Sequence, residues 1–205
     1  MLARRLAVFG AAGALAAIIV PHAYAVKVHV RVEGKTRTIF GPRAPVIDVT
    51  SPRANPLPEN ALDALAAASF LGEFYVHVTD THVDQIGRFP AQGQTGWAIK
   101  VNGKSASSHT TLRAGDSVLW YWAQYGIVGG PKTLVLSRAG GASCYRVVAQ
   151  DDKGRVTPAL GALLRVDGRT ARTQGATQAA VACVGTHRGL VRATLGGAVR
   201  SNALP

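Results

Sequence analysis

The 205-residue chain has few of the features by which enzymes are identified from sequence. No glycine-rich phosphate loop is present, because Gly10–Gly13 falls in the apolar N-terminus and Gly126–Gly130 lacks the flanking residues that such a loop requires. No pair of carboxylates stands in an acid–base arrangement, and no histidine after residue 25 belongs to a recognised catalytic motif. These absences predict a protein that is not an enzyme and that needs no cofactor.

Cysteine is scarce, since Cys144 and Cys183 are the only two. A zinc site would need four ligands at short spacing, and His187 is the single further ligand nearby. Two free buried thiols are the other alternative. Both cysteines fall in β-prone segments, and a disulfide between them agrees with an oxidising compartment, so we predict that bridge and no metal site.

Long apolar runs are limited to the N-terminus. Two arginines precede Leu6–Val20, which contains no charge, and Pro21 ends the run. Ala23-Tyr24-Ala25 then supplies the small-x-small pattern that signal peptidase requires. This order predicts a signal peptide over residues 1–25 and a secreted, extracytoplasmic protein. The alternative is an uncleaved anchor, although the run is shorter than the roughly 20 residues that span a bilayer. After cleavage we expect no stable membrane insertion.

Acidic residues are few in the second half of a chain whose net charge is +12. Residues 131–205 hold eleven Lys and Arg against three Asp and Glu, whereas residues 26–130 are close to neutral. Contact with polyanions such as wall polymers is one interpretation. The arginines are scattered, without adjacent basic residues or stacking aromatics, which favours a solubilising surface and predicts no nucleic-acid binding.

The first part of the mature chain predicts a sheet and one helix. Val26–Glu33 alternates apolar and polar residues without a fault, as a half-buried strand does, and Thr36–Phe40 follows a tight turn as a second strand. A proline-rich stretch over residues 42–58 indicates an extended loop. Asn60 then caps a predicted helix over Ala61–Phe70.

Three further strands are expected in this part: Phe74–Thr79, Trp97–Val101 and Ser117–Trp122. Two strands, a helix and three strands predict an α+β fold for residues 26–125. Residues 126–131 indicate a linker. Beyond it, short β runs separated by turns at intervals near ten residues predict a small all-β sandwich over residues 132–205.

Three segments of the first predicted domain carry a family resemblance. Ala61–Leu65, Thr95–Gly103 and Leu112–Trp122 match, in order and spacing, the transcobalamin-like C-terminal domain family, which residues 26–125 resemble over nearly their whole length. The resemblance implies a β-grasp-like sheet packed on a helix. In animal transcobalamins the similar domain closes over cobalamin together with a large helical domain, so binding of a cobalamin-type ligand by this chain would require a partner.

A looser resemblance covers the second predicted domain. Pro158–Gly168 and Val184–Thr194 look like parts of a transthyretin-like, carboxypeptidase-regulatory-like or Ig-like β-sandwich. Domains of this kind usually space or present other domains, so the resemblance implies a spacer without catalytic residues.

Two groups of side chains are candidates for a site. Trp97, Trp120, Trp122 and Tyr125 form an aromatic cluster that would serve either as core or as a platform for a ligand, with residues 87–96 as its rim. Asp80, His82 and Asp84 would share a strand face, either as a solvated edge or as part of a metal site that lacks further ligands.

Together these observations predict a secreted, non-catalytic bacterial module that binds an unknown small molecule or a cell-surface partner. The first alternative is a structural or adhesive cell-surface protein whose basic second domain contacts wall polymers. The second alternative is binding of a cobalamin-type ligand with a partner. Trp97, Trp120, Trp122 and Tyr125 are the predicted ligand-binding residues.

Overall fold

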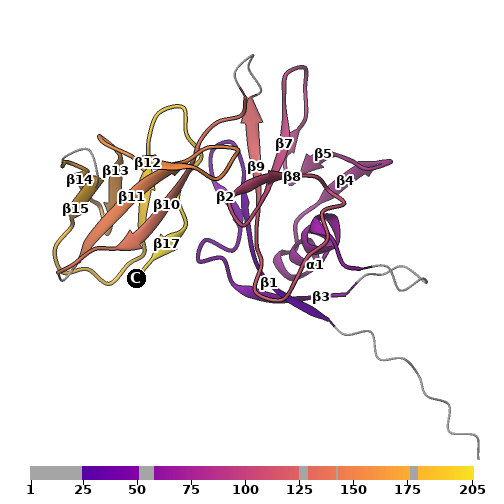
Figure 1. Ribbon diagram of the computed structural model, residues 1–205, viewed down its shortest axis with the longest axis horizontal. Helices are drawn as coiled ribbons and strands as arrows, with labels where there is room; N and C mark the ends of the chain where they lie inside the picture. Colours follow the sequence, from indigo (N-terminus) through magenta and orange to yellow (C-terminus); the bar gives the residue numbers. More distant parts are fainter. Residues whose placement is uncertain (1–24, 51–57, 125–128, 142, 176–179) are drawn as a thin grey trace, which may run out of the picture.

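The chain is mostly β, with one helix and seventeen strands among the residues described by the computed structural model (Figure 1). The described residues are 25–50, 58–124, 129–141, 143–175 and 180–205. Most of the predicted signal peptide, Tyr125 and part of the predicted linker lie outside these ranges. Within them, no helix is long and apolar enough to cross a membrane. We call residues 25–124 the N-terminal part and residues 129–205 the C-terminal part.

A six-stranded sheet forms the centre of the N-terminal part. Its strands are β1 (Val26–Glu33), β2 (Thr38–Phe40), β3 (Val46–Val49), β7 (Thr95–Val101), β8 (Lys104–Ala106) and β9 (Ser117–Gln124). The order is β2-β1-β9-β7-β8, and β3 also pairs with β1. The central strands β1 and β9 are parallel, whereas every other pair in this sheet is antiparallel. The first and last strands of the part therefore lie side by side.

The predicted helix is present as α1 (Ala61–Gly72) and begins at the predicted cap. The Asn60 side chain accepts hydrogen bonds from the backbone amides of Leu62 and Asp63, and the Asp63 carboxylate accepts one from the Asn60 amide over 2.9 Å. This reciprocal arrangement satisfies amides that a helix start leaves free. The helix ends at Gly72, two residues beyond the predicted Phe70, because Glu73 adopts a left-handed conformation.

A small sheet lies beside the helix. It consists of β4 (Val76–Thr79), β5 (His82–Ile86) and β6 (Phe89–Pro90). The register between β4 and β5 shifts at His77, where two residues of β5 face one residue of β4. Residues 87–96, expected to be a loop, therefore contain a short strand.

The C-terminal part consists of two four-stranded sheets, as expected for a β-sandwich. One contains β10 (Thr133–Arg138), β11 (Cys144–Gln150), β12 (Val156–Pro158) and β15 (Ala180–Cys183). The other contains β13 (Leu163–Val166), β14 (Arg169–Arg172), β16 (Val191–Thr194) and β17 (Ala203–Leu204). Leu134, Val147, Leu164 and Val191 belong to the apolar core of this part. Cys144 and Cys183 lie opposite each other on β11 and β15 and form the predicted disulfide.

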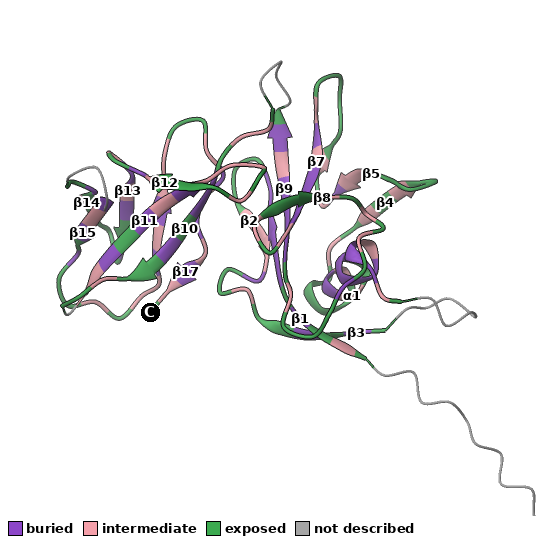
Figure 2. Ribbon diagram, in the orientation of Figure 1, coloured by how far each residue is buried: buried purple, intermediate pink, exposed green. Residues whose placement is uncertain are grey.

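The central N-terminal sheet is covered on both faces. Val28, Val30 and Val32 of β1 pack in one core with α1, as the alternation predicted. The opposite face meets the C-terminal part, where Val199 joins the cluster that contains Tyr121. Figure 1 shows the sheet between α1 and the C-terminal sheets, and in Figure 2 the strands β1 and β9 are buried along much of their length. The polar face of β1 is therefore partly buried, contrary to the expectation of a half-buried strand.

Candidate functional site

A single carboxylate lies among three arginines where the two parts meet. Glu33, at the end of β1, is 0 % exposed. Its carboxylate lies 3.8 Å from Arg31 Nε, 3.5 Å from Arg192 Nη2 and 3.1 Å from Arg200 Nη2. The Thr38 hydroxyl also donates to it. Three guanidinium groups around one carboxylate leave an excess of positive charge in a place that water reaches poorly.

Arg31 is the most deeply buried of these cations, with 6 % of its surface exposed. Its Nη1 is buried and has no hydrogen-bond partner among the described residues. Burial lowers the pKa of Arg31 to about 10; Glu33 opposes this change, and the charges of Arg192 and Arg200 add to it. An unpaired buried donor costs free energy, about 1–3 kcal/mol for a neutral group and more for a charged one. Arg31 thus adds a buried positive charge where the two parts of the chain meet.

A cavity of about 300 Å³ adjoins Arg31 and is formed by both parts of the chain. Its basic residues are His29, Arg31, Arg43 and Lys100. Its polar lining from the C-terminal part includes Thr133, Gln150 and Asn202. His29 and Arg43 are exposed and stand at positions from which they can meet a ligand that arrives from solvent. Among the residues that the structure describes, no carboxylate lines this cavity.

Lys100 lines the cavity but has partners of its own. Its side chain is 1 % exposed, and Nζ donates to the carbonyl oxygens of Gln150 and Asp151 over 3.0 Å each and to the Thr133 hydroxyl over 3.3 Å. Asp152 Oδ1 lies 3.5 Å away. Burial lowers the pKa of Lys100, and Asp152 opposes this change. The ammonium therefore joins the two parts, and its three donors are committed to protein oxygens.

The predicted aromatic cluster is divided between the core and a partly exposed pair. Trp120 is 1 % exposed, and its indole N–H donates to the Ala61 carbonyl over 3.1 Å, so it belongs to the core under α1. Trp97 and Trp122 are opposite each other on β7 and β9, with ring centroids 5.5 Å apart and ring planes nearly perpendicular.

Phe89 also contacts this pair, because its carbonyl accepts from the Trp97 indole and its ring lies 6.2 Å from that of Trp122. Both tryptophans are half-buried. The structure thus brings Trp97 and Trp122 together and removes Trp120 from any open surface. Tyr125 lies outside the described residues. The prediction that these aromatics bind a ligand stays a prediction for Trp97 and Trp122.

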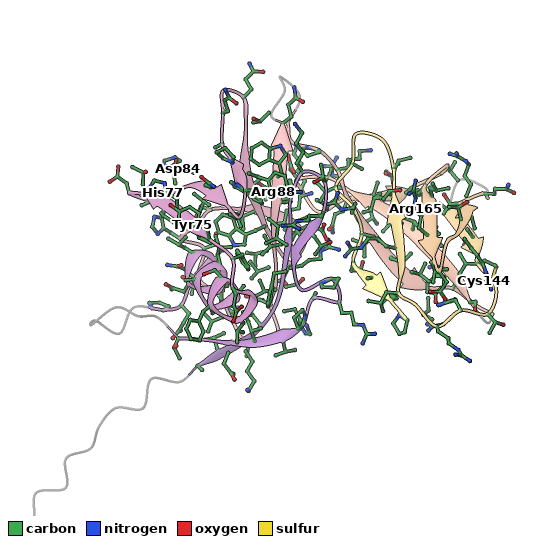
Figure 3. The ribbon with its side chains drawn as sticks, turned by 180° about the vertical axis from the view of Figure 1, so that it is seen from behind. Tyr75, His77, Asp84, Arg88, Cys144 and Arg165 are labelled. Atoms are coloured by element: carbon green, nitrogen blue, oxygen red, sulfur yellow. A yellow bond between two sulfur atoms is a disulfide. The ribbon has the colours of Figure 1, made fainter. Side chains whose placement is uncertain are left out.

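The second candidate group from the sequence is Asp80, His82 and Asp84. Asp84, at the register shift of β5, faces His77 of β4, with 3.3 Å between Asp84 Oδ2 and His77 Nδ1 (Figure 3). It also accepts from the Thr79 hydroxyl over 2.5 Å. Among the described residues, no group of three or more His, Cys, Asp or Glu side chains could hold a metal ion.

No protein-family model, no curated protein and no solved structure matches this chain. The resemblances to the transcobalamin-like and Ig-like families therefore stay predictions, and the site is interpreted from its own chemistry.

Proposed function

We propose that the chain is an extracytoplasmic, non-catalytic binding module that holds a small anion in the cavity between its two parts. The observation that supports this most directly is the lining of the cavity, which among the described residues contains Arg31, Arg43 and Lys100 but no carboxylate. Carboxylate and phosphate oxygens are the acceptors that a guanidinium fork binds best. An oxyanion in the cavity would therefore reduce the excess positive charge beside Arg31.

The size and lining of the cavity indicate a small ligand. A volume of about 300 Å³ is at the lower end of the range for ligand pockets, which run from about 300 to 1,000 Å³. Arg43 and His29, both exposed at the cavity, would contact the ligand from the solvent side. A site formed by two parts of a chain is typical of small-molecule binding.

Two further observations support the remaining parts of the proposal. The disulfide between Cys144 and Cys183 is a bond that persists in oxidising compartments, in agreement with the predicted signal peptide. The parallel pairing of β1 and β9, with α1 on one face of the sheet, agrees with the β-grasp arrangement that the transcobalamin-like resemblance implies.

Calorimetric titration of the purified chain with citrate and with inorganic phosphate tests this proposal. Glycerol serves as the uncharged control ligand. Arg43→Gln removes an exposed cation of the cavity, and Arg31→Lys keeps the buried charge but removes the guanidinium fork. We expect each change to weaken binding of the better anion about tenfold, the effect of losing one charge-assisted hydrogen bond.

Arg113→Gln is the matched control, because Arg113 is exposed in the N-terminal part and does not line the cavity. It removes the same charge as Arg43→Gln and should leave binding nearly unchanged. Equal affinities in the wild type, Arg43→Gln and Arg31→Lys would overturn the proposal. Equal losses in Arg43→Gln and Arg113→Gln would also overturn it, since they would indicate attraction by net charge alone.

A further inference from the structure

A second group of arginines lies on the outer face of the C-terminal sheet that contains β13 and β16. Arg165 of β13 is directly opposite Arg192 of β16 in antiparallel register. Together with Arg200 they line an open groove of about 490 Å³. Thr194 and, from the N-terminal part, Thr36 complete its polar lining. Figure 3 shows Arg165 on the C-terminal part, away from Cys144 at the far end.

The pairing of Arg165 with Arg192 is unfavourable by itself. Side chains directly opposite each other on antiparallel strands lie close together, and two like charges in this position destabilise a sheet. Arg165 forms no ion pair in the part of the chain that the structure describes, and no carboxylate lines the groove. The fold thus places Arg165 opposite Arg192 on one face of the sheet, and Arg165 has no acidic partner among the described residues.

Glu33 does not fully compensate this charge. It is shared with Arg31 and Arg200, and Arg192 Nη2 remains 3.5 Å from its carboxylate without a hydrogen bond. Burial lowers the pKa of Arg192, as does the charge of Arg200, while Glu33 opposes both. Arg192 Nη2 is buried against Glu33 and Nη1 donates to the Thr38 hydroxyl, so Arg192 contributes positive charge to the groove rather than a free donor.

We propose that this groove binds phosphate groups, through the Arg165 guanidinium and the hydroxyls of Thr36 and Thr194, with Arg192 and Arg200 adding positive charge to its wall. The donors come from two strands and from the segment after β1, so they surround the groove from more than one direction. A carboxylate presents two oxygens in one plane, whereas the tetrahedral phosphate presents oxygens to donors on several sides. The dianion also neutralises the repulsion between the paired arginines.

This site is separate from the cavity beside Arg31 and does not rest on the proposed function. The two cavities have no lining residue in common, and Arg165 belongs to the groove alone. Free phosphate and the phosphate esters of a larger molecule share the chemistry that these donors recognise. Inorganic phosphate and glycerol 3-phosphate are the two probes that distinguish those sources.

The first experiment measures binding of each probe by calorimetry to the wild type and to Arg165→Gln. Arg165 is exposed, so the change should not impair folding. We expect about a tenfold loss of affinity for the preferred probe, since one charge-assisted, bidentate contact is lost. Free phosphate is the ligand if both probes bind alike; tighter binding of glycerol 3-phosphate indicates an ester, and either result supports the site.

Arg146→Gln is the matched control. Arg146 is an exposed residue of β11, on the other sheet of the C-terminal part, and its loss removes the same charge. The proposal requires that Arg146→Gln binds as the wild type does. It is overturned if Arg165→Gln and Arg146→Gln have equal affinities, or if neither probe binds the wild type at about 10 mM, a concentration above the weakest affinities of specific sites.

Thermal unfolding provides a second, independent measurement. Without phosphate, Arg165→Gln should raise the Tm by about 1 °C, because it relieves the repulsion from Arg192. Arg165→Glu should raise it further by forming a cross-strand ion pair. With saturating phosphate the order should reverse, because the ligand stabilises the wild type alone. A Tm of Arg165→Glu below that of the wild type in both conditions would show that the arginine pair is not strained, and would contradict the proposal.

Discussion

Lys100 of β7 is hydrogen-bonded to Gln150 of β11, and this contact joins the two parts of the chain. The Lys100 ammonium donates to the Gln150 carbonyl over 3.0 Å and is almost completely buried. The turn after β7 also packs against Gln150. A side chain at Gly103 would clash there, since its Cβ atom would be 2.2 Å from the Gln150 side chain. The backbones of Ser105 and Asp152 are also hydrogen-bonded over 2.8 Å. The interface thus includes polar contacts, of which those of the Lys100 ammonium are buried.

Lys100→Met should lower the free energy of unfolding by about 2–3 kcal/mol. Methionine keeps most of the volume, but the carbonyls of Gln150 and Asp151 lose a charged donor in a buried place. Urea denaturation followed by far-UV circular dichroism measures the change. Lys153→Met is the control, because Lys153 is exposed in a turn of the C-terminal part. Equal stabilities of the two variants would contradict the assigned role of Lys100.

Glu33→Gln should lower the free energy of unfolding more than the loss of any exposed carboxylate does. It leaves the guanidinium groups of Arg31, Arg192 and Arg200 without their shared counter-ion. Removal of one partner from a buried ion pair typically costs about 3–5 kcal/mol. Urea denaturation of Glu33→Gln and of a surface variant measures the difference.

Asp48→Asn is that surface variant. Its carboxylate lies 2.7 Å from Lys27 Nζ, but both side chains are more than half exposed. Exposed ion pairs contribute less than about 1 kcal/mol, so Asp48→Asn should scarcely alter stability. If Glu33→Gln lowered the free energy of unfolding as little as Asp48→Asn does, the cluster around Glu33 would not contribute to the joining of the two parts.

Local patterns predicted the elements that local physics determines. The valine alternation of β1, the Asn60 cap and the bridge between Cys144 and Cys183 are all confirmed. Each depends on residues near in sequence or on a pair of rare residues. The short strands β3, β6 and β8 were missed. β3 lies within residues 42–58, where the prolines predicted an extended loop, and β6 and β8 have only two and three residues, too few to show an alternation.

The cluster around Glu33 could not be predicted from such patterns. On β1, Arg31 and Glu33 occupy the polar side of the alternation, which ordinarily faces water. Burial of that side depends on the C-terminal part, and Arg200 reaches Glu33 across 167 positions of sequence. The scattered arginines were interpreted as a solubilising surface for the same reason: sequence spacing does not show that Arg165 and Arg192 lie opposite each other.

Reduction of the disulfide should lower the stability of the C-terminal part. A loop closed between Cys144 and Cys183 contributes about 4 kcal/mol by the chain-entropy estimate. Cys183 is exposed, so dithiothreitol can reach the bond. All three tryptophans belong to the N-terminal part, and Trp97 and Trp120 pack in its core, so their fluorescence reports mainly on that part, although Trp122 also lines a pocket with Val199 and Arg200. The far-UV transition should therefore shift to lower temperature more than the fluorescence transition does.

The double variant Cys144→Ser and Cys183→Ser controls for other effects of the reductant. Its melting curve without dithiothreitol should match that of the reduced wild type. An unchanged far-UV transition on reduction would contradict a stabilising bridge.

Asp167 should contribute stability that is lost in acid. Its carboxylate accepts hydrogen bonds from the amides of Arg188 and Gly189 over 2.9 and 3.1 Å. These bonds lower the pKa of Asp167 below its ordinary value of 3.8. Because the unfolded chain binds the proton more tightly, the contribution is fully present above the ordinary pKa, and it disappears as the pH falls through the lower pKa of the folded state.

Asp167→Asn tests this dependence through the free energy of unfolding measured between pH 2 and pH 7. At neutral pH the variant should be less stable than the wild type, and the two curves should converge as the solution becomes acidic. Asp80→Asn, a change in an exposed turn of the N-terminal part, removes the same charge and is the control. A constant difference between wild type and Asp167→Asn over the whole range would show that the asparagine loses packing rather than charge-assisted hydrogen bonds. The turn that joins Asp167 to Arg188 and Gly189 would then not depend on the ionised carboxylate.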